Sequence, residues 1–191
     1  MPTRLPDFPL RPAGPAATGF LSRGLGGYRD AARWVLALPY GRGQGRDELA
    51  IFSELRGTCS TKHALLARLA AEHGVAVELV LAIYLMSEQN TPGVGEVLRA
   101  HHIDAIPEAH CVLRWQGRLI DLTRALPPSA SPPPALEFLH TRTIVPADIA
   151  AHKPELHRRY LADWIATKLP DRTLDEVWSI REACIAALAM H

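Results

Sequence analysis

The chain has 191 residues, of which 48% are hydrophobic and 21% are charged, and its formal net charge at pH 7 is +1. This length and apolar content allow a sizeable hydrophobic core and exclude an intrinsically disordered chain. The small net charge argues against a surface for nucleic acid, and no apolar run reaches the roughly 18 residues that a membrane span needs. We therefore expect a globular protein with no nucleic-acid or membrane partner.

The cysteine content and the N-terminal sequence bear on location. Three cysteines at wide spacings do not predict a disulfide framework. The N-terminus lacks the apolar segment of a secretory signal peptide. Both observations favour a reducing, cytoplasmic setting.

Residues 1–27 are expected to form an N-terminal arm. Prolines recur in this segment, which ends in a glycine-rich stretch at residues 24–27, so an extended arm is more favourable than a helix. The arm could pack on the body of the protein, cover a cleft as a lid, or contact a second copy. The remaining residues, 28–191, are expected to form a single domain with a core over about 38–145.

Two helices are predicted before the first candidate site residue. Apolar residues at helical spacing predict a helix over residues 28–38, which Pro39 ends, and a short helix over 47–55. The loop between them contains Gln44. A polar side chain upstream of a nucleophile can stabilise developing negative charge, so Gln44 is either an oxyanion candidate or a solvent-exposed loop residue.

Residues 56–66 (Arg-Gly-Thr-Cys-Ser-Thr-Lys-His-Ala-Leu-Leu) predict a turn and the start of a helix. The Thr58 hydroxyl can cap the first amides of this helix, which should run from Cys59 to His73 and stop at Gly74. Unpaired amides and the positive end of the helix dipole stabilise a thiolate in the first turn. Cys59 is therefore the candidate nucleophile.

Two further residues of this helix could support the cysteine. Lys62 either lowers the pKa of the thiol by its charge or extends to solvent. His63 lies one turn beyond Cys59 and either assists the thiolate or is a buried histidine bonded to the backbone.

A β-hairpin is predicted downstream, where residues 108–115 and 118–123 flank the dipeptide Gln116-Gly117. With this turn, residue 115 faces 118, 113 faces 120 and 112 faces 121. Because side chains alternate, His110 and Asp121 would be diagonal neighbours on one face, roughly 7–8 Å apart at the backbone. A nucleophile, a base and a residue that orients the base is the arrangement used in covalent catalysis.

The segment between helix and hairpin predicts a buried strand over 75–85, a polar loop over 86–95 and a short helix over 96–102. Gln89 and Asn90 in the loop are candidate substrate or oxyanion contacts, as is Thr58.

The C-terminal third predicts a proline-rich loop over 127–134, a strand over 138–145 and a helical pair over 154–190. Thr173 and Glu176 form a capping-box pattern at the start of the last helix. The apolar faces of this pair pack either in the core of the chain or against another subunit, which leaves a homo-oligomer open.

At this point the residues resemble a known family. Cys, His and Asp in this chain order, on a helix start and two successive strands, resemble the transglutaminase-like (papain-like) cysteine superfamily. Four stretches look more closely like a group of small bacterial transglutaminase-like proteins without an assigned substrate: residues 38–42, 57–66, 89–93 and 107–110. That group has an Asn after the Gly-Arg of its first motif, where this chain has Gly43-Gln44.

The resemblance covers about residues 38–123 and has three implications. It implies an α+β fold, in which the helix bearing the cysteine packs on an antiparallel sheet, with additional C-terminal helices. It implies Cys59 as nucleophile, His110 as general base and acid, and Asp121 as the residue that orients the imidazole. It implies no cofactor.

Three functions remain open from the sequence. The first is cysteine-dependent acyl transfer on an amide or peptide, with the thioester resolved by water (amidase, peptidase or deamidase) or by an amine (transglutaminase). The second is a transglutaminase-like module that binds without turnover. The third is a Cys/His metal site, although the tight ligand spacing usual for zinc is absent; the residues in question are Cys59, His63, His101, His102 and His110.

Overall fold

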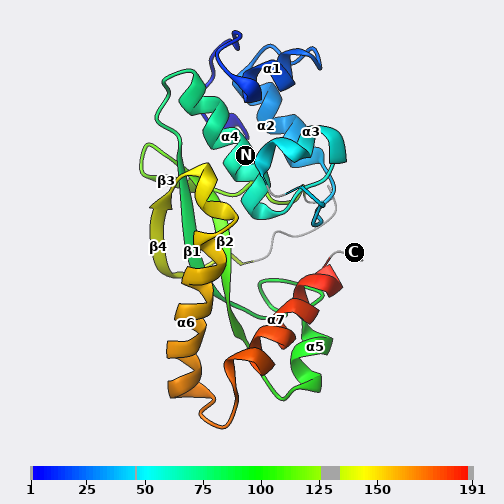
Figure 1. The fold of residues 1–191 in the computed structure, drawn as a ribbon, viewed down its shortest axis with the longest axis vertical. Helices are drawn as coiled ribbons and strands as arrows, with labels where there is room; N and C mark the ends of the chain where they lie inside the picture. Colours follow the sequence, from blue (N-terminus) through cyan, green and yellow to red (C-terminus); the bar gives the residue numbers. More distant parts are fainter. Residues whose placement is uncertain (1, 46, 126–133, 189–191) are drawn as a thin grey trace. The chain divides into compact units, whose positions relative to one another are not determined.

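The computed structural model of the chain describes residues 2–45, 47–125 and 134–188. Within these residues the fold is of the predicted α+β class, with seven α-helices and four β-strands (Figure 1). The helices are α1 (Pro15–Leu21), α2 (Tyr28–Ala37), α3 (Ile51–Glu54), α4 (Cys59–Glu72), α5 (Gly95–Ala100), α6 (His152–Lys168) and α7 (Leu174–Leu188). The strands are β1 (Glu78–Met86), β2 (Ile106–Trp115), β3 (Arg118–Ile120) and β4 (Phe138–Ile144), and short 3₁₀ helices cover Pro2–Arg4, Glu48–Ala50 and Pro146–Ile149.

The chain divides into two compact units. The first unit comprises Met1–Leu81, Cys111–Pro127 and Arg142–Ala150, and the second comprises Ala82–His110, Pro128–Thr141 and Ala151–His191. The strand order of the sheet is β3-β2-β1-β4. The proline-rich loop predicted over 127–134 lies almost entirely outside the described residues.

The hairpin of β2 and β3 has the predicted turn and register. Leu113 pairs with Ile120 and Trp115 with Arg118, in an antiparallel arrangement. Residue 116 has φ 48° and Gly117 has φ 74°. Positive φ at both central residues is what a two-residue type I′ turn requires, and it explains why this dipeptide fixes the register.

The second hairpin strand is shorter than predicted, because β3 ends at Ile120 rather than at residue 123. The two amides that would extend it have other acceptors. The Leu122 N–H donates to His63 Nε2 at 2.7 Å, and the Thr123 N–H donates to Asp121 Oδ1 at 2.8 Å. Asp121 therefore follows the strand instead of belonging to it.

Helix α4 is the core element of the first unit. Residues on all its sides are buried, which agrees with a sequence that is apolar on more than one face. It packs against α1 and α2 (Figure 1). The buried Tyr28 hydroxyl donates to the Leu66 carbonyl at 3.1 Å. The buried residues of α4 are Cys59, Ser60, Lys62, His63, Ala64, Leu65, Leu66, Ala67, Leu69 and Ala70.

The N-terminal arm contains a helix, α1, where the prolines predicted none. Pro15 stands in its first turn, where a missing N–H costs nothing. The Glu72 carboxylate accepts the amides of Ala16 (3.0 Å) and Ala17 (2.7 Å), and so caps α1 from the last residue of α4. The partner that stabilises α1 lies 56 residues away from Ala16, which local sequence cannot reveal.

A second contact ties the same arm to the same end of α4. The Arg11 amide donates to His73 Nε2 at 3.1 Å, and the Phe8 ring lies 5.3 Å from the His73 ring. Both contacts are at the end of α4 opposite Cys59. These contacts hold the arm against the C-terminal end of α4.

In the second unit, α6 and α7 pack against each other. Their buried apolar residues are Leu161, Ile165, Val177, Ile180, Cys184, Ile185 and Leu188. The predicted capping box is present, since the Thr173 amide donates to Glu176 Oε2 (2.7 Å) and the Glu176 amide to Thr173 Oγ1 (3.3 Å). No helix in the described part of the chain combines the length and apolar character needed to cross a membrane.

A buried ion pair joins α7 to β2 within this unit. Arg181 donates from Nε and Nη2 to the two oxygens of Glu108, both at 2.6 Å, and each side chain is less than 10% exposed. Burial acts to raise the pKa of Glu108, but the charge and hydrogen bonds of Arg181 outweigh it and hold that pKa below its usual value. The Trp178 ring lies beside this pair, 5.3 Å from the Arg181 guanidinium and 5.1 Å from the His157 ring.

Candidate functional site

Cys59 is placed by the turn and the cap that precede it. Thr58 is the N-cap of α4, and its hydroxyl accepts the Thr61 amide while Thr61 Oγ1 accepts the Thr58 amide, which makes a capping box. Gly57 is packed so closely that a Cβ would lie 2.9 Å from Thr61 Oγ1 and from Ile51. A larger residue at position 57 would have to displace both of these side chains.

The Cys59 thiol is nearly buried, with 6% of the residue exposed, at the first residue of a 14-residue helix. Its Sγ lies 3.8 Å from Ser60 Oγ. The first amides of a helix and the positive end of its dipole favour a negative charge at this position. The location matches the one predicted from the sequence.

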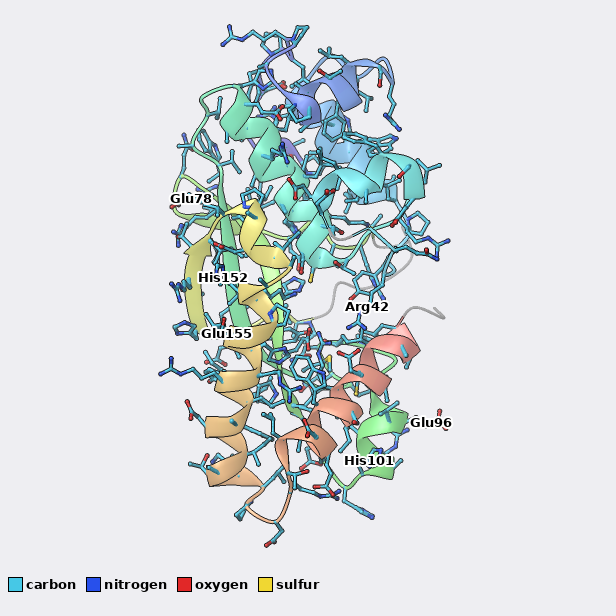
Figure 2. All side chains as sticks on the ribbon, in the orientation of Figure 1. Arg42, Glu78, Glu96, His101, His152 and Glu155 are labelled. Carbon is cyan, nitrogen blue, oxygen red and sulfur yellow. The ribbon has the colours of Figure 1, made fainter. Side chains whose placement is uncertain are left out.

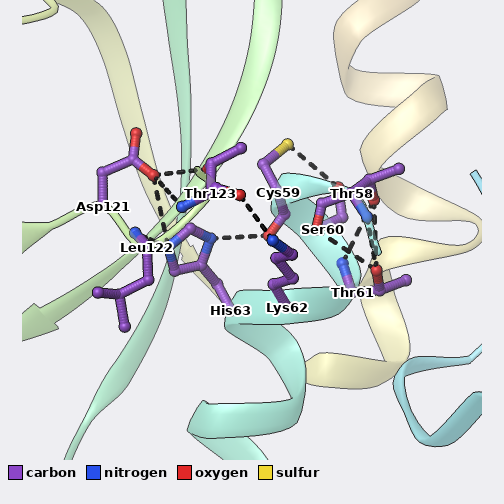
Figure 3. A network of polar contacts seen from close by, with 9 residues as sticks. All are labelled: Thr58, Cys59, Ser60, Thr61, Lys62, His63, Asp121, Leu122 and Thr123. Carbon is purple, nitrogen blue, oxygen red and sulfur yellow. Dashed lines mark hydrogen bonds and ion pairs between the residues drawn. The ribbon is translucent and has the colours of Figure 1, made fainter. Parts of the chain in front are cut away.

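Lys62 is fully buried, which excludes its extension to solvent. Its Nζ donates to the Leu38 carbonyl at 2.6 Å. The same Nζ donates to the Thr123 carbonyl at 2.8 Å (Figure 3). Burial first, and then the charge of Arg124, lower the pKa of this ammonium to about 8, although the charges of Asp121 and Cys59 act to raise it. Sequence analysis missed both carbonyl partners, since they lie far from Lys62 in the chain.

His63 is a buried histidine held by the backbone at both ring nitrogens. Nδ1 lies 2.7 Å from the Cys59 carbonyl oxygen, and Nε2 accepts the Leu122 N–H at 2.7 Å. These partners require a proton on Nδ1 and none on Nε2, so the ring is neutral. Its contact with Asp121, 3.6 Å from Nε2 to Oδ1, is therefore not an ion pair. Figure 3 shows His63 between the start of α4 and the segment that follows β3.

Asp121 closes a tight turn just beyond β3. Its Oδ1 accepts both the amide (2.8 Å) and the hydroxyl (2.6 Å) of Thr123, and its side chain is 42% exposed. The Thr123 carbonyl in turn accepts from Lys62, so the turn is fastened to α4 by the lysine. Cys59, Lys62, His63 and Asp121 all belong to the first unit.

His110 is a residue of β2 and belongs to the second unit. The ring is 8% exposed and meets the Tyr84 ring edge to face, with centroids 5.9 Å apart. The Tyr84 hydroxyl lies 3.1 Å from Thr91 Oγ1. Tyr84 was not among the predicted site residues, although its place in β1 beside β2 makes it a neighbour of His110.

The remaining polar candidates lie in loops. Gln44 is exposed, and its backbone amide donates to Glu54 Oε1 at 2.8 Å. Gln89 is exposed in the loop after β1. Asn90 closes that loop, since its side chain accepts the Ser87 amide (3.1 Å) and donates to the Leu85 carbonyl (2.8 Å).

The other two cysteines lie elsewhere. Cys111 is fully buried in β2, and Cys184 is fully buried in α7. Burial raises the pKa of the Cys184 thiol to about 11, and the negative charge of Glu108 adds to the rise. Neither thiol has the environment of a reactive cysteine.

The metal alternative gains no geometric support from the described residues. His101 follows α5, and Figure 2 labels it there. In the part of the chain that the structure describes, no three His, Cys, Asp or Glu side chains gather as they would around an ion.

Comparison with known proteins identifies no relative, because no family model, no curated protein and no solved structure matches the chain. The candidate site therefore consists of a cysteine at the start of a helix, a buried ammonium one turn away from it, and the Asp121–Thr123 turn, whose carbonyl accepts from that ammonium.

Proposed function

We propose that the protein is a cysteine-dependent acyl-transfer enzyme acting on amides or peptides, with Cys59 as the nucleophile. The observation that carries the proposal is the position of Cys59, at the first residue of α4 behind the Thr58 cap. Helix amides and the dipole lower the pKa of a thiol at such a place, and only the thiolate attacks carbonyl carbon efficiently.

In the proposed reaction the Cys59 sulfur bonds to the carbonyl carbon of the substrate. The carbon–nitrogen bond then breaks as an imidazolium gives its proton to the leaving amine, and a thioester remains. Water attacks the thioester to release an acid, or an amine attacks it to form a new amide. Cleavage of the thioester in either way regenerates the free Cys59 thiol.

His110 is proposed as the general base and acid, and Asp121 as the residue that orients it. The proposal rests on the order Cys, His, Asp along the chain and on the hairpin register. We also propose a transglutaminase-like fold for the chain. Because its three thiols are not in disulfide bonds, we propose that the protein works in the reducing environment of the cytoplasm. Oxyanion and substrate contacts are proposed among Gln44, Thr58, Gln89 and Asn90.

The proposal is tested by the pH dependence of iodoacetamide alkylation, read peptide by peptide with mass spectrometry. We expect Cys59 to react far faster than Cys111 and Cys184 below pH 7, and His110→Ala to slow it. Cys111 and Cys184 serve as internal references in the same sample.

Two results would contradict the proposal. One is a Cys59 that titrates as an ordinary thiol near ~8.5. The other is a reactive Cys59 whose substitution by serine changes no turnover in a screen of fluorogenic amides with and without an amine acceptor. The first result would favour the non-catalytic binding module.

A further inference from the structure

Lys62 is unusual because its positive charge is buried and no carboxylate of the described residues is hydrogen-bonded to it. A buried ammonium is normally paired with an anion, since its removal from water is costly. Both hydrogen bonds that Lys62 makes to described residues go to neutral main-chain carbonyls, those of Leu38 and Thr123. Arg124 adds a second positive charge close enough to lower the Lys62 pKa.

The two carbonyls belong to segments that border the start of α4. Leu38 leads into a segment that pairs with Gly57, since the Gly57 amide donates to the Pro39 carbonyl and the Gly41 amide to the Gly57 carbonyl, both at 3.2 Å. Thr123 ends the Asp121 turn. Lys62 therefore joins three pieces of chain within one unit: the first turn of α4, the Leu38 segment and the Asp121 turn.

Lys62 also stands three residues after Cys59 on the same helix, a spacing that puts two side chains on one face about 5–6 Å apart at Cβ. The other charged or titratable groups that face it are Asp121 and Arg124. His63, the next residue, is neutral because both ring nitrogens are bonded to backbone groups. Among the described residues, the thiolate of Cys59 and the partly exposed carboxylate of Asp121 are the negative groups whose charge acts on the ammonium.

We propose that Lys62 is a positioning residue of the Cys59 site, whose ammonium stabilises the Cys59 thiolate and fastens the Asp121–Thr123 turn to α4. The inference rests on the proposed function, because it takes Cys59 as the nucleophile. Lys62 then supplies part of the positive charge that stabilises the resting thiolate. Part of this stabilisation therefore remains when the imidazole of His110 is neutral or absent. Lys62 itself does not touch the substrate.

The experiment compares the alkylation pH profile of Cys59 in wild type and in Lys62→Met. Methionine keeps an unbranched side chain of similar length but removes the charge. We expect the apparent pKa of Cys59 to rise by about one unit, and alkylation below that pKa to slow about tenfold. Lys62→Gln, which retains a donor for the carbonyls, should give the same rise and serves if the methionine variant does not fold.

The matched control is Arg68→Met, which removes another cation of α4. Arg68 is nine residues from Cys59, roughly 13 Å along the helix and beyond the ~10 Å screening length at 0.1 M salt. This variant should leave the Cys59 profile unchanged. In the His110→Ala background, Lys62→Met should still raise the pKa of Cys59.

The outcomes separate this inference from the proposed function. If wild-type Cys59 has a low pKa and folded Lys62→Met keeps the same value, Lys62 is merely structural and the inference is wrong while the proposed nucleophile stands. If wild-type Cys59 already titrates like an ordinary thiol, both are wrong.

Discussion

At the scale of single residues, His63 and His73 make the same pair of bonds in different surroundings. In each, Nδ1 contacts the carbonyl four residues earlier in α4 and Nε2 accepts a backbone amide, from Leu122 or from Arg11. The His63 ring is fully buried, whereas the His73 bond to Arg11 is exposed. Comparing the two histidines therefore measures, within one helix, how much a buried side-chain acceptor contributes to the free energy of unfolding.

We expect His63→Leu to lower the free energy of unfolding by about 1–3 kcal/mol, because the buried Leu122 N–H then has no acceptor. His73→Leu should cost less than 1 kcal/mol, because water can replace the ring at an exposed amide. Urea unfolding of both variants checks this. Equal losses would show that burial at Leu122 is not what makes the His63 bond valuable.

The residue scale also shows where sequence analysis stops. Cys59 and Thr58 were predicted from a pattern of neighbours, and the structure places them as predicted. The partners of Lys62 could not be found in this way, because Leu38 lies 24 residues before it and Thr123 lies 61 residues after it. A buried charge is recognised only when distant carbonyls are brought to it.

At the scale of elements, local patterns predicted what local physics decides. The hairpin register follows from two residues with positive φ, and the start of α7 follows from its capping box. The predictions failed where a distant group intervenes. His63 takes the amide of Leu122 and shortens β3, and Glu72 caps α1 in a segment whose prolines argued against a helix.

Substitution of Glu72 by Ala tests this cap. We expect a loss of about 1–2 kcal/mol in the free energy of unfolding, because two amides at the start of α1 lose a charged acceptor. Cys59 alkylation should not change, since 13 residues of helix place Glu72 roughly 20 Å from it.

Glu96→Ala, in the exposed first turn of α5, is the control for losing a surface carboxylate. The measurements are urea unfolding and the rate of Cys59 alkylation, made on the same samples of both variants. A change in Cys59 reactivity in Glu72→Ala would mean that the arm acts on the site after all.

At the scale of the whole molecule, each unit contains a buried charged group that is held by residues distant in the sequence. The first unit has Lys62 bound to two carbonyls, and the second has Glu108 bound to Arg181 across 73 residues of sequence. Periodicity predicted most helices, and the α+β class was expected from the resemblance to a known family. Neither could predict these arrangements, because their energies depend on burial that only the folded chain creates.

The Glu108–Arg181 pair makes the free energy of unfolding depend on pH in the acidic range. Because the pKa of Glu108 is depressed in the folded state, its contribution is complete above the unfolded value near ~4.3 and is lost as the pH falls through the folded value. We expect Glu108→Gln to cost about 3 kcal/mol at pH 7 and to flatten the loss of stability below pH ~4. Urea unfolding between pH 3 and pH 7 measures both effects.

Glu182→Gln is the matched control, because Glu182 also binds Arg181 but is 33% exposed. It should cost no more than about 1 kcal/mol. An equal cost for the two variants would show that burial of Glu108 does not set the strength of the pair.

The ring contacts of Trp178 have a consequence for observation. Its indole lies 5.1 Å from the His157 imidazole, with the guanidinium groups of Arg158 and Arg181 at 4.9 Å and 5.3 Å from the ring centre. Trp34 in the first unit instead stacks on Phe52, 6.0 Å away, beneath the guanidinium of Arg23. Trp34 and Trp178 are two of the four tryptophans of the chain and lie in different units, so a variant that keeps only one of them would report by its emission on that unit without any attached dye.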